Sequence, residues 1–358
     1  MRSRFKHCHR LKDGRVLNAR TMQSILCFAL IVAAISLLAL SPARAQAMRT
    51  YVAGTGTDSG PCTVTAPCRT LQAALNKTLP GGEIQSLDSA DYGSVTITRA
   101  VTILGTHGTA GVLATNVSGI TINAGPSDVI NLRGLDIDGG GSGANGILFT
   151  SGAALNIDDS VIRSFANGIT VSSTNQSSFS INNTSISNNT VGLSVQSSAP
   201  SMGVLSGAEV VNNGTGLTAS GANASSPINL TIQGSVVANN TTVGVVSGAY
   251  SVVTVAGSMV ANNGVGLEAV STTGLLETSR STVTGNGTGW TTANGGWVYS
   301  AGGNSIGGNL SGNSAPPTSA TPPPPPSPPP PPPPAVNYLL DGAGNTLLDS
   351  TGGKLTAP

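Results

Sequence analysis

A repeat of about 23 residues constrains the fold of this chain more than any other feature. A glycine followed by an apolar residue recurs at intervals of roughly 22 to 28 residues. These glycines are Gly146, Gly168, Gly192, Gly216, Gly244, Gly266 and Gly289. A unit this short cannot bury its own apolar face, so the units must stack on one another to share one core.

Two further landmarks repeat with the same period and predict strands. A residue that is apolar in all but the last unit recurs at Ile137, Ile157, Ile181, Leu205, Ile232, Val255 and Thr278. A small residue follows three positions later, at Gly140, Ser160, Thr184, Ala208, Ser235, Ser258 and Ser281. The flanking residues alternate apolar and polar, as at 155–158, which is the period of a β-strand. We expect the first set to form one inward-facing column.

Asparagine-rich segments separate the landmarks and predict sharp corners. They read N-N-T-V-G-L at Asn188, N-N-G-T-G-L at Asn212, N-N-T-T-V-G-V at Asn239 and N-N-G-V-G-L at Asn262. Asparagine and glycine tolerate the left-handed backbone conformation that a tight corner needs. In stacked turns, asparagines at equivalent corners can also hydrogen-bond to one another along the stack.

These patterns predict an all-β fold, a right-handed parallel β-helix solenoid of about 10 turns with a short N-terminal capping helix. Helical solenoids are disfavoured because the repeats are rich in glycine, asparagine and threonine. A propeller would need units nearer 40–50 residues. The net charge of +1 and the 3% of aromatic residues exclude a general attraction for nucleic acid.

The first residues, 1–47, are typical of a signal peptide. Seven basic residues precede an apolar run at 25–40, and small residues then offer cleavage after Ala45 or Ala47. The alternative is a permanent membrane anchor, for which a run of about 16 residues is short. We therefore expect export by a bacterium to the periplasm, the cell surface or the medium, with no membrane span in the mature chain.

The remaining chain divides into four segments. Residues 48–92 are expected to form an N-terminal strand, a disulfide loop and a capping helix at 69–77, and residues 93–312 the β-helix. Cys62 and Cys68 are predicted to form a disulfide, since two thiolates without further ligands make a poor metal site. Residues 313–336 are a proline-rich linker that favours an extended spacer, and 337–358 a short hairpin-like tail.

One segment resembles a known family. Residues 49–75, R-T-Y-V-A-G-T-G-T-D-S-G-P-C…A-P-C-R-T-L-Q-A-A-L, are similar to the opening of bacterial right-handed β-helix proteins of the pectin-lyase-like superfamily. With the repeat, the resemblance covers about residues 48–312. It implies the β-helix fold. It leaves the chemistry open, because most members of this group have no assigned activity whereas the superfamily also contains pectate lyases and polygalacturonases.

One group of acidic residues is the candidate for a catalytic or calcium-binding site. Aligning Ile137 with Ile157 puts Asp136 and Asp138 on the outside of one turn, stacks Asp158 on Asp138, and leaves Asp159 beside it. Such a set could supply two catalytic carboxylates or a Ca²⁺ site at Asp138 and Asp158. The simplest interpretation is solvated outward side chains. Stacked like charges need compensation by a cation, an arginine, a raised pKa or solvent.

Three aromatic residues near the last repeats have two interpretations. Trp290, Trp297 and Tyr299 either plug the C-terminal end of the coil or form a platform for a ligand. A plug is the favoured interpretation.

For function, the sequence favours a secreted or surface-displayed, non-catalytic β-helix that binds a polysaccharide or a cell-surface component, or serves as structural display. The alternative is a polysaccharide lyase or glycoside hydrolase that acts on an acidic, pectin-like polysaccharide. No cofactor other than calcium is suggested, and no nucleic-acid partner is expected.

Overall fold

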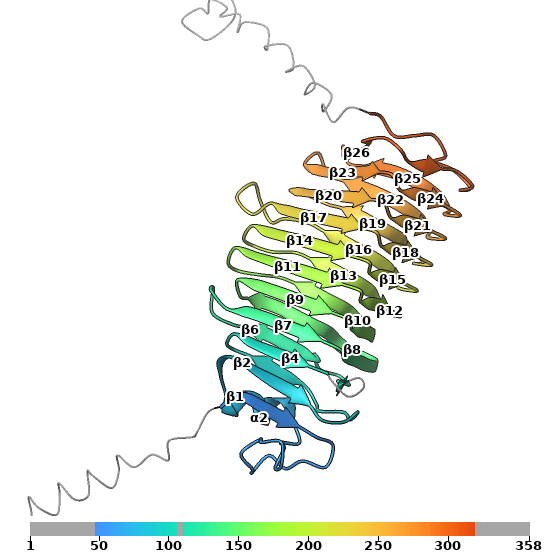
Figure 1. Ribbon diagram of the computed structural model, residues 1–358. Coiled ribbons are helices and arrows are strands. Elements are labelled where there is room, and N and C mark those ends of the chain that lie inside the picture. The colour runs from blue at the N-terminus through green and yellow to red at the C-terminus, as the bar shows by residue number, and fades with distance from the viewer. Residues whose placement is uncertain (1–46, 106–109, 319–358) are drawn as a thin grey trace, which may run out of the picture.

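The computed structural model describes residues 47–105 and 110–318. The chain winds into a right-handed parallel β-helix of about nine turns, which confirms the predicted fold. Figure 1 shows the turns stacked into a rod, with the first strands at one end and the last strands at the other. Nearly all of the predicted signal peptide, most of the proline-rich linker and the whole C-terminal tail lie outside the described residues.

The first sheet contains 11 strands, each paired in parallel with the strand one turn away. In spatial order they are β1 (Ala47–Val52), β2 (Thr78–Ser86), β4 (Val101–Leu104), β7 (Val129–Arg133), β9 (Ala154–Asp158), β11 (Ser177–Asn182), β14 (Ser201–Ser206), β17 (Ile228–Gln233), β20 (Ser251–Ala256), β23 (Gly274–Ser279) and β26 (Trp297–Ser300).

The second sheet contains 16 strands in two columns that meet at a corner. One column holds β5 (Ala110–Leu113), β12 (Ser185–Ser187), β15 (Glu209–Val211), β18 (Val236–Ala238), β21 (Met259–Ala261), β24 (Thr282–Thr284) and β27 (Ser305–Ile306). The other holds β3 (Val95–Ile97), β6 (Ile120–Asn123), β13 (Val191–Val195), β16 (Thr215–Ala219), β19 (Val243–Ser247), β22 (Val265–Val270) and β25 (Thr288–Ala293). The long strands β8 (Leu135–Ser151) and β10 (Val161–Val171) bend around the corner and join the columns.

The inward column predicted from the repeat is present from Ile157 onward. Strand pairing aligns the fully buried residues Leu132, Ile157, Ile181, Leu205, Ile232, Val255 and Thr278. The small residues that follow them are also buried, and several link the turns through hydrogen bonds. The backbone N–H of Ser235, for example, donates to Oγ of Ser258 at 3.1 Å.

The first member of each predicted column is wrong. Ile137 pairs with Ile162 in the second sheet, so the residue that precedes Ile157 in its column is Leu132. Gly140, with a positive φ of 58°, lies in a glycine-rich stretch of β8 and outside the ladder of small residues. This stretch shifts the register between β8 and β10. Spacing along the sequence therefore does not show that Leu132, and not Ile137, precedes Ile157 in the column.

The asparagine-rich corners form the predicted ladder, and the two asparagines of each pair have different roles. The first has a positive φ, from 56° to 59°, at Asn188, Asn212, Asn239 and Asn262. The second is buried, at Asn189, Asn213, Asn240 and Asn263, and so are the equivalent Asn286 and Asn309, each of which follows a glycine. Each buried Oδ1 after the first accepts from both the backbone N–H and the Nδ2 group of the preceding asparagine, at 2.9–3.1 Å. The corner is therefore cross-linked from turn to turn.

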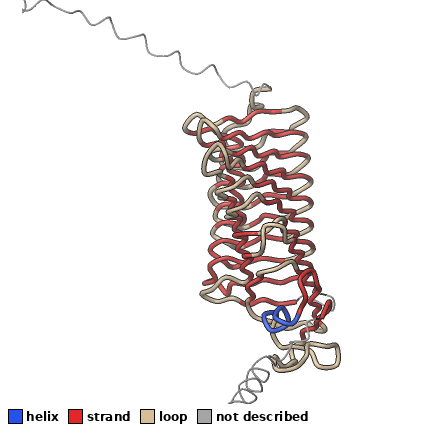
Figure 2. The backbone as a smooth tube through the Cα atoms, turned by 90° about the vertical axis from the view of Figure 1, so that its left-hand side faces the viewer, coloured by secondary structure: helices blue, strands red, loops and turns tan. Residues whose placement is uncertain are grey.

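The N-terminal end of the rod is capped as predicted. The helix α2 (Leu71–Lys77) buries Leu71, Ala74 and Leu75, and Figure 2 shows it against the end of the stack. The disulfide between Cys62 and Cys68 is present. Its loop also covers the outer edge of β1, because backbone groups of both cysteines hydrogen-bond to this strand or to the residue after it, at 2.8–2.9 Å. The exposed sheet edge is thereby closed.

The C-terminal end is closed by different means. Trp290 occupies the inward position in register with Leu267, packs against the core, and donates from Nε1 to the carbonyl oxygen of Ser314 at 2.7 Å. Oδ1 of Asn313 accepts the last hydrogen bonds of the asparagine ladder. Trp290 therefore fits the predicted plug. Within 47–105 and 110–318, no helix is long and apolar enough to cross a membrane.

The asparagine ladder generates a stability prediction. Replacement of Asn240 by alanine leaves the carbonyl oxygen of Val210 and the backbone N–H of Asn213 without these partners. Because unpaired buried polar groups cost about 1–3 kcal/mol each, the free energy of unfolding should fall by about 2–4 kcal/mol in urea titrations. Asn239→Gly is the control, since Asn239 is exposed with a φ of 56° that glycine adopts freely. Equal losses for the two variants would contradict a role for the ladder.

Candidate functional site

Asp136 and Asp138 share one arginine on the outer face of the second sheet. They flank the buried Ile137 on β8, and Arg163 on β10 is in register with Asp138. Nη1 and Nη2 of Arg163 donate to the two oxygens of Asp136 at 2.6 and 3.2 Å, and Nε donates to Oδ2 of Asp138 at 2.9 Å. Each of the three side chains is about one-third exposed, at 28–34%. We call these residues the Arg163 cluster.

The two aspartates of the Arg163 cluster stabilise the charged form of Arg163. Burial alone would lower the pKa of Arg163, but the hydrogen bonds and charges of Asp136 and Asp138 outweigh burial and raise it above the usual value. The guanidinium therefore stays charged and holds both carboxylates. Of the possible compensations for the acidic residues, an arginine is the one that this part of the structure shows.

Asp158 and Asp159 belong to a different sheet. Asp158 ends β9 in the first sheet, and its Oδ1 accepts from Nδ2 of Asn182 at 2.9 Å. Asp159 follows at a corner with a φ of 49°. Its Oδ1 accepts from Nδ2 of Asn183 at 2.8 Å, and its Oδ2 accepts from Arg133 at 2.9–3.0 Å. The hydrogen bond from Asn183, and then the one from Arg133, hold the pKa of Asp159 below its usual value.

The predicted stacking of Asp158 on Asp138 is therefore wrong. The neighbours of Asp158 in register are Arg133 and Asn182, whereas those of Asp138 are Leu113 and Arg163. The error follows from the misplaced Ile137, because moving one strand into the other column moves both of its aspartates. The four aspartates form two separate pairs instead of one acidic patch.

The residues predicted to hold calcium do not fit a shared ion. Both oxygens of Asp138 already accept hydrogen bonds, Oδ1 from the backbone N–H of Gly140 at 2.8 Å and Oδ2 from Arg163. Asp158 lies in the other sheet and accepts from Asn182. Calcium takes six to eight oxygen ligands, and two carboxylates that lie in different sheets and already accept hydrogen bonds do not supply such a set. No group of three or more histidine, cysteine, aspartate or glutamate side chains that could hold a metal occurs among the described residues.

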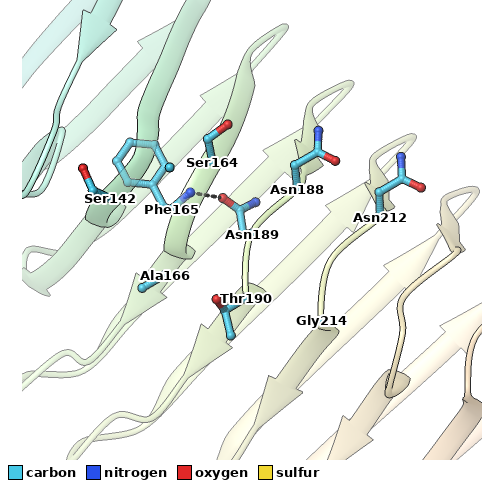
Figure 3. A pocket seen from close by; sticks show the side chains of 11 residues that line it. Ser142, Ser164, Phe165, Ala166, Asn188, Asn189, Thr190, Asn212 and Gly214 are labelled. Carbon is cyan, nitrogen blue, oxygen red and sulfur yellow. Dashed lines mark hydrogen bonds between the residues drawn. The ribbon is translucent and has the colours of Figure 1, made fainter.

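An open groove of about 680 Å³, lined by both polar and apolar residues, lies next to the Arg163 cluster in the chain. Its polar side chains are Ser142, Ser164, Asn188, Thr190 and Asn212. Figure 3 shows Asn188 and Asn212 standing outward from successive turns, while the buried Asn189 turns inward and accepts from the backbone N–H of Phe165 at 3.0 Å.

Backbone geometry explains why these side chains face the groove. Ser164, Asn188 and Asn212 have φ values of 65°, 57° and 59°, and this left-handed corner directs one residue outward before the next one enters the core. The groove therefore presents uncharged hydroxyl and amide groups, which can donate and accept hydrogen bonds with a hydroxylated ligand. Arg163 directly precedes Ser164, so the cluster and the groove share β10.

Sequence reasoning missed the groove, although its signal was visible. The sequence predicts that the asparagine pairs form corners and a hydrogen-bonded ladder, yet the exposed member of each pair also presents its amide to solvent. The bidentate pairing of Arg163 with Asp136 depends on the register between β8 and β10, which the sequence does not reveal.

Comparison with known proteins supports the fold. No protein-family model and no curated protein matches the sequence. Pectate lyase Pel9A aligns over 70% of this chain and 74% of its own, with 14% identity and a TM-score of 0.53. A rhamnogalacturonan lyase aligns over 66% of this chain and 76% of its own, with 12% identity and a TM-score of 0.35. The likeness to Pel9A shows that the chain has the parallel β-helix fold.

The pairing of the aspartates generates a prediction about calcium. Titration of the protein with calcium in a calorimeter should give no saturable heat up to millimolar concentrations, because the oxygens of Asp138 are held by Arg163 and Gly140. Saturable heat that disappears in the Asp138→Asn variant would contradict this arrangement. Asp159→Asn is the matched control, since Asp159 is also paired with an arginine but lies at a corner beside the first sheet.

Proposed function

We propose that the chain is an exported β-helix protein that binds polysaccharide on its outer surface and does not cleave it. The observation that carries the proposal is the engagement of all four candidate aspartates by arginine, asparagine or backbone donors, together with a groove next to Arg163 whose polar side chains are uncharged. A carboxylate held in an ion pair is poorly prepared to move protons, whereas neutral polar side chains suit a hydroxylated ligand.

Further features support export, surface display and a carbohydrate partner. The disulfide between Cys62 and Cys68 fits an oxidising compartment, as does the predicted signal peptide. The structural neighbour Pel9A is a pectate lyase, so this fold is used elsewhere by a protein that acts on polysaccharide. The proline run at 322–334 would serve as a spacer for display on a surface.

A panel of soluble polysaccharides tests the proposal. The purified protein should be retarded in native gels that contain at least one neutral polysaccharide, such as hydroxyethyl cellulose or galactomannan. It should release neither unsaturated nor reducing ends from neutral polysaccharides or from polygalacturonate during prolonged incubation. Retardation fails if the groups on the outer surface do not recognise sugars, and the proposal then falls.

The second candidate is a lyase or hydrolase acting on acidic polysaccharide. The position of the Arg163 cluster beside the groove favours it, because Arg163 could hold a carboxylate of the substrate while Asp138 accepts a proton. Sugar release that falls at least about 100-fold in Asp138→Asn, but not in Asp159→Asn, would establish this function in place of the first. Equal thermal midpoints for the two variants would exclude an effect through stability.

A further inference from the structure

The aromatic residues near the C-terminal end of the rod divide into two groups by direction. Trp290 points into the core in the second sheet. Trp297 and Tyr299 lie two positions apart on β26 and are half-buried, whereas Val298 between them is 2% exposed. Because side chains alternate along a strand, the two rings stand on the outer face of the first sheet. The plug therefore explains Trp290 and leaves the other two aromatic residues without a role.

The aromatic pair is positioned by β23, the strand that pairs with β26. Trp297 is in register with Leu275, and Tyr299 is in register with Glu277 on β23. The hydroxyl of Tyr299 donates to Oε2 of Glu277 at 2.7 Å. Burial, and then this carboxylate, raise the pKa of Tyr299 to about 12, so the phenol stays neutral. At about 3.3 Å per residue, the two side chains start about 6.6 Å apart, on neighbouring positions of one surface.

An apolar column continues from the pair along the rod. Trp297 is followed in register by Leu275, Val252, Asn229 and Met202, so four of the five residues are apolar. Met202 is 52% exposed and Val252 is 36% exposed, which is unusual for such large apolar side chains in a surface otherwise rich in hydroxyls.

A second column runs beside it and is more polar. From Tyr299 it continues in register through Glu277, Thr254, Thr231 and Val204. The outer face of the first sheet thus offers an apolar stripe and a stripe with hydroxyl and carboxylate groups, both parallel to the axis of the rod.

The charge of this half of the chain restricts the class of ligand. Between residues 164 and 318 the charged residues are Glu209, Glu268, Glu277 and Arg280, so negative charge predominates. An acidic polysaccharide would meet repulsion at Glu277, whereas a neutral one would find an acceptor for its hydroxyl groups.

We propose that Trp297, Tyr299 and Glu277 form a binding platform for a neutral pyranose polysaccharide, which lies along the apolar column toward Met202. The inference rests on the proposed polysaccharide binding, and it adds to the groove at the second sheet a binding surface on the first sheet, with its ligand class. A pyranose ring has one apolar face of C–H groups and an edge of hydroxyls. The faces of Trp297 and Tyr299 suit the former, and Glu277 with the threonines of the neighbouring column suits the latter.

Affinity electrophoresis of the full chain tests this platform. Hydroxyethyl cellulose, galactomannan and polygalacturonate serve as the probes, and the dissociation constant is taken from retardation against polysaccharide concentration. We expect the wild type to bind a neutral probe and Trp297→Ala to weaken binding at least about tenfold, as expected for the loss of a central aromatic contact. Tyr299→Ala should have a similar effect, whereas Tyr299→Phe keeps the ring and should have a smaller one.

Two control variants guard against indirect effects. Trp297→Leu retains an apolar side chain above Leu275, so it should keep the thermal midpoint and still lose binding. Met259→Ala removes a 42% exposed apolar side chain from the second sheet and should leave binding unchanged.

The outcomes separate this inference from the proposed function. If the wild type binds none of the probes, both fail. If it binds a neutral probe and Trp297→Leu binds equally well, the platform is wrong while polysaccharide binding stands. Binding to polygalacturonate alone would overturn the assigned ligand class.

Discussion

The hydrogen bonds between buried asparagine amides hold the turns of this rod in register. Each internal member of the ladder, such as Asn240, accepts two hydrogen bonds from the turn before and donates from Nδ2 to the turn after and to a backbone carbonyl. Both the oxygen and the nitrogen of the amide thus have two hydrogen-bond partners, at a corner where the chain must bend and the strand pairing is interrupted. No buried side-chain nitrogen or oxygen in the described part of the chain lacks a partner, so this polar core carries no unpaired group.

A fixed register decides which side chains reach solvent. Because strand residues alternate between the core and the surface, a slip of one residue would exchange the two sets. The ladder therefore also maintains the outer columns, among them the one that runs from Met202 to Trp297. The register also separates the aspartates, since Asp138 and Asp158 lie in strands of different sheets. The proposed binding platform depends on columns that lie along the axis of the rod more than on any single turn.

The sequence predicts the structural features that repeat from turn to turn, and it does not predict those that occur only once. The column from Ile157 to Thr278 recurs from unit to unit, and so do the asparagine corners from Asn188 onward. Asp138 lies where the repeat is broken by the glycine-rich stretch of β8, so spacing from Ile137 pointed to the wrong column. The direction of Trp297 was also beyond the sequence pattern, because Trp290 is equally close to the last turn and faces the core.

Radical footprinting of side chains, with and without a neutral polysaccharide, tests most directly whether these columns bind sugar. Oxidation by hydroxyl radicals reports the solvent exposure of each tryptophan, tyrosine and methionine. We predict that galactomannan or hydroxyethyl cellulose protects Trp297, Tyr299 and Met202 in the first sheet and leaves Met259 in the second sheet unchanged. Unchanged oxidation of Trp297 and Tyr299 at saturating polysaccharide, or protection of Met259 instead, would contradict the assignment of the binding surface.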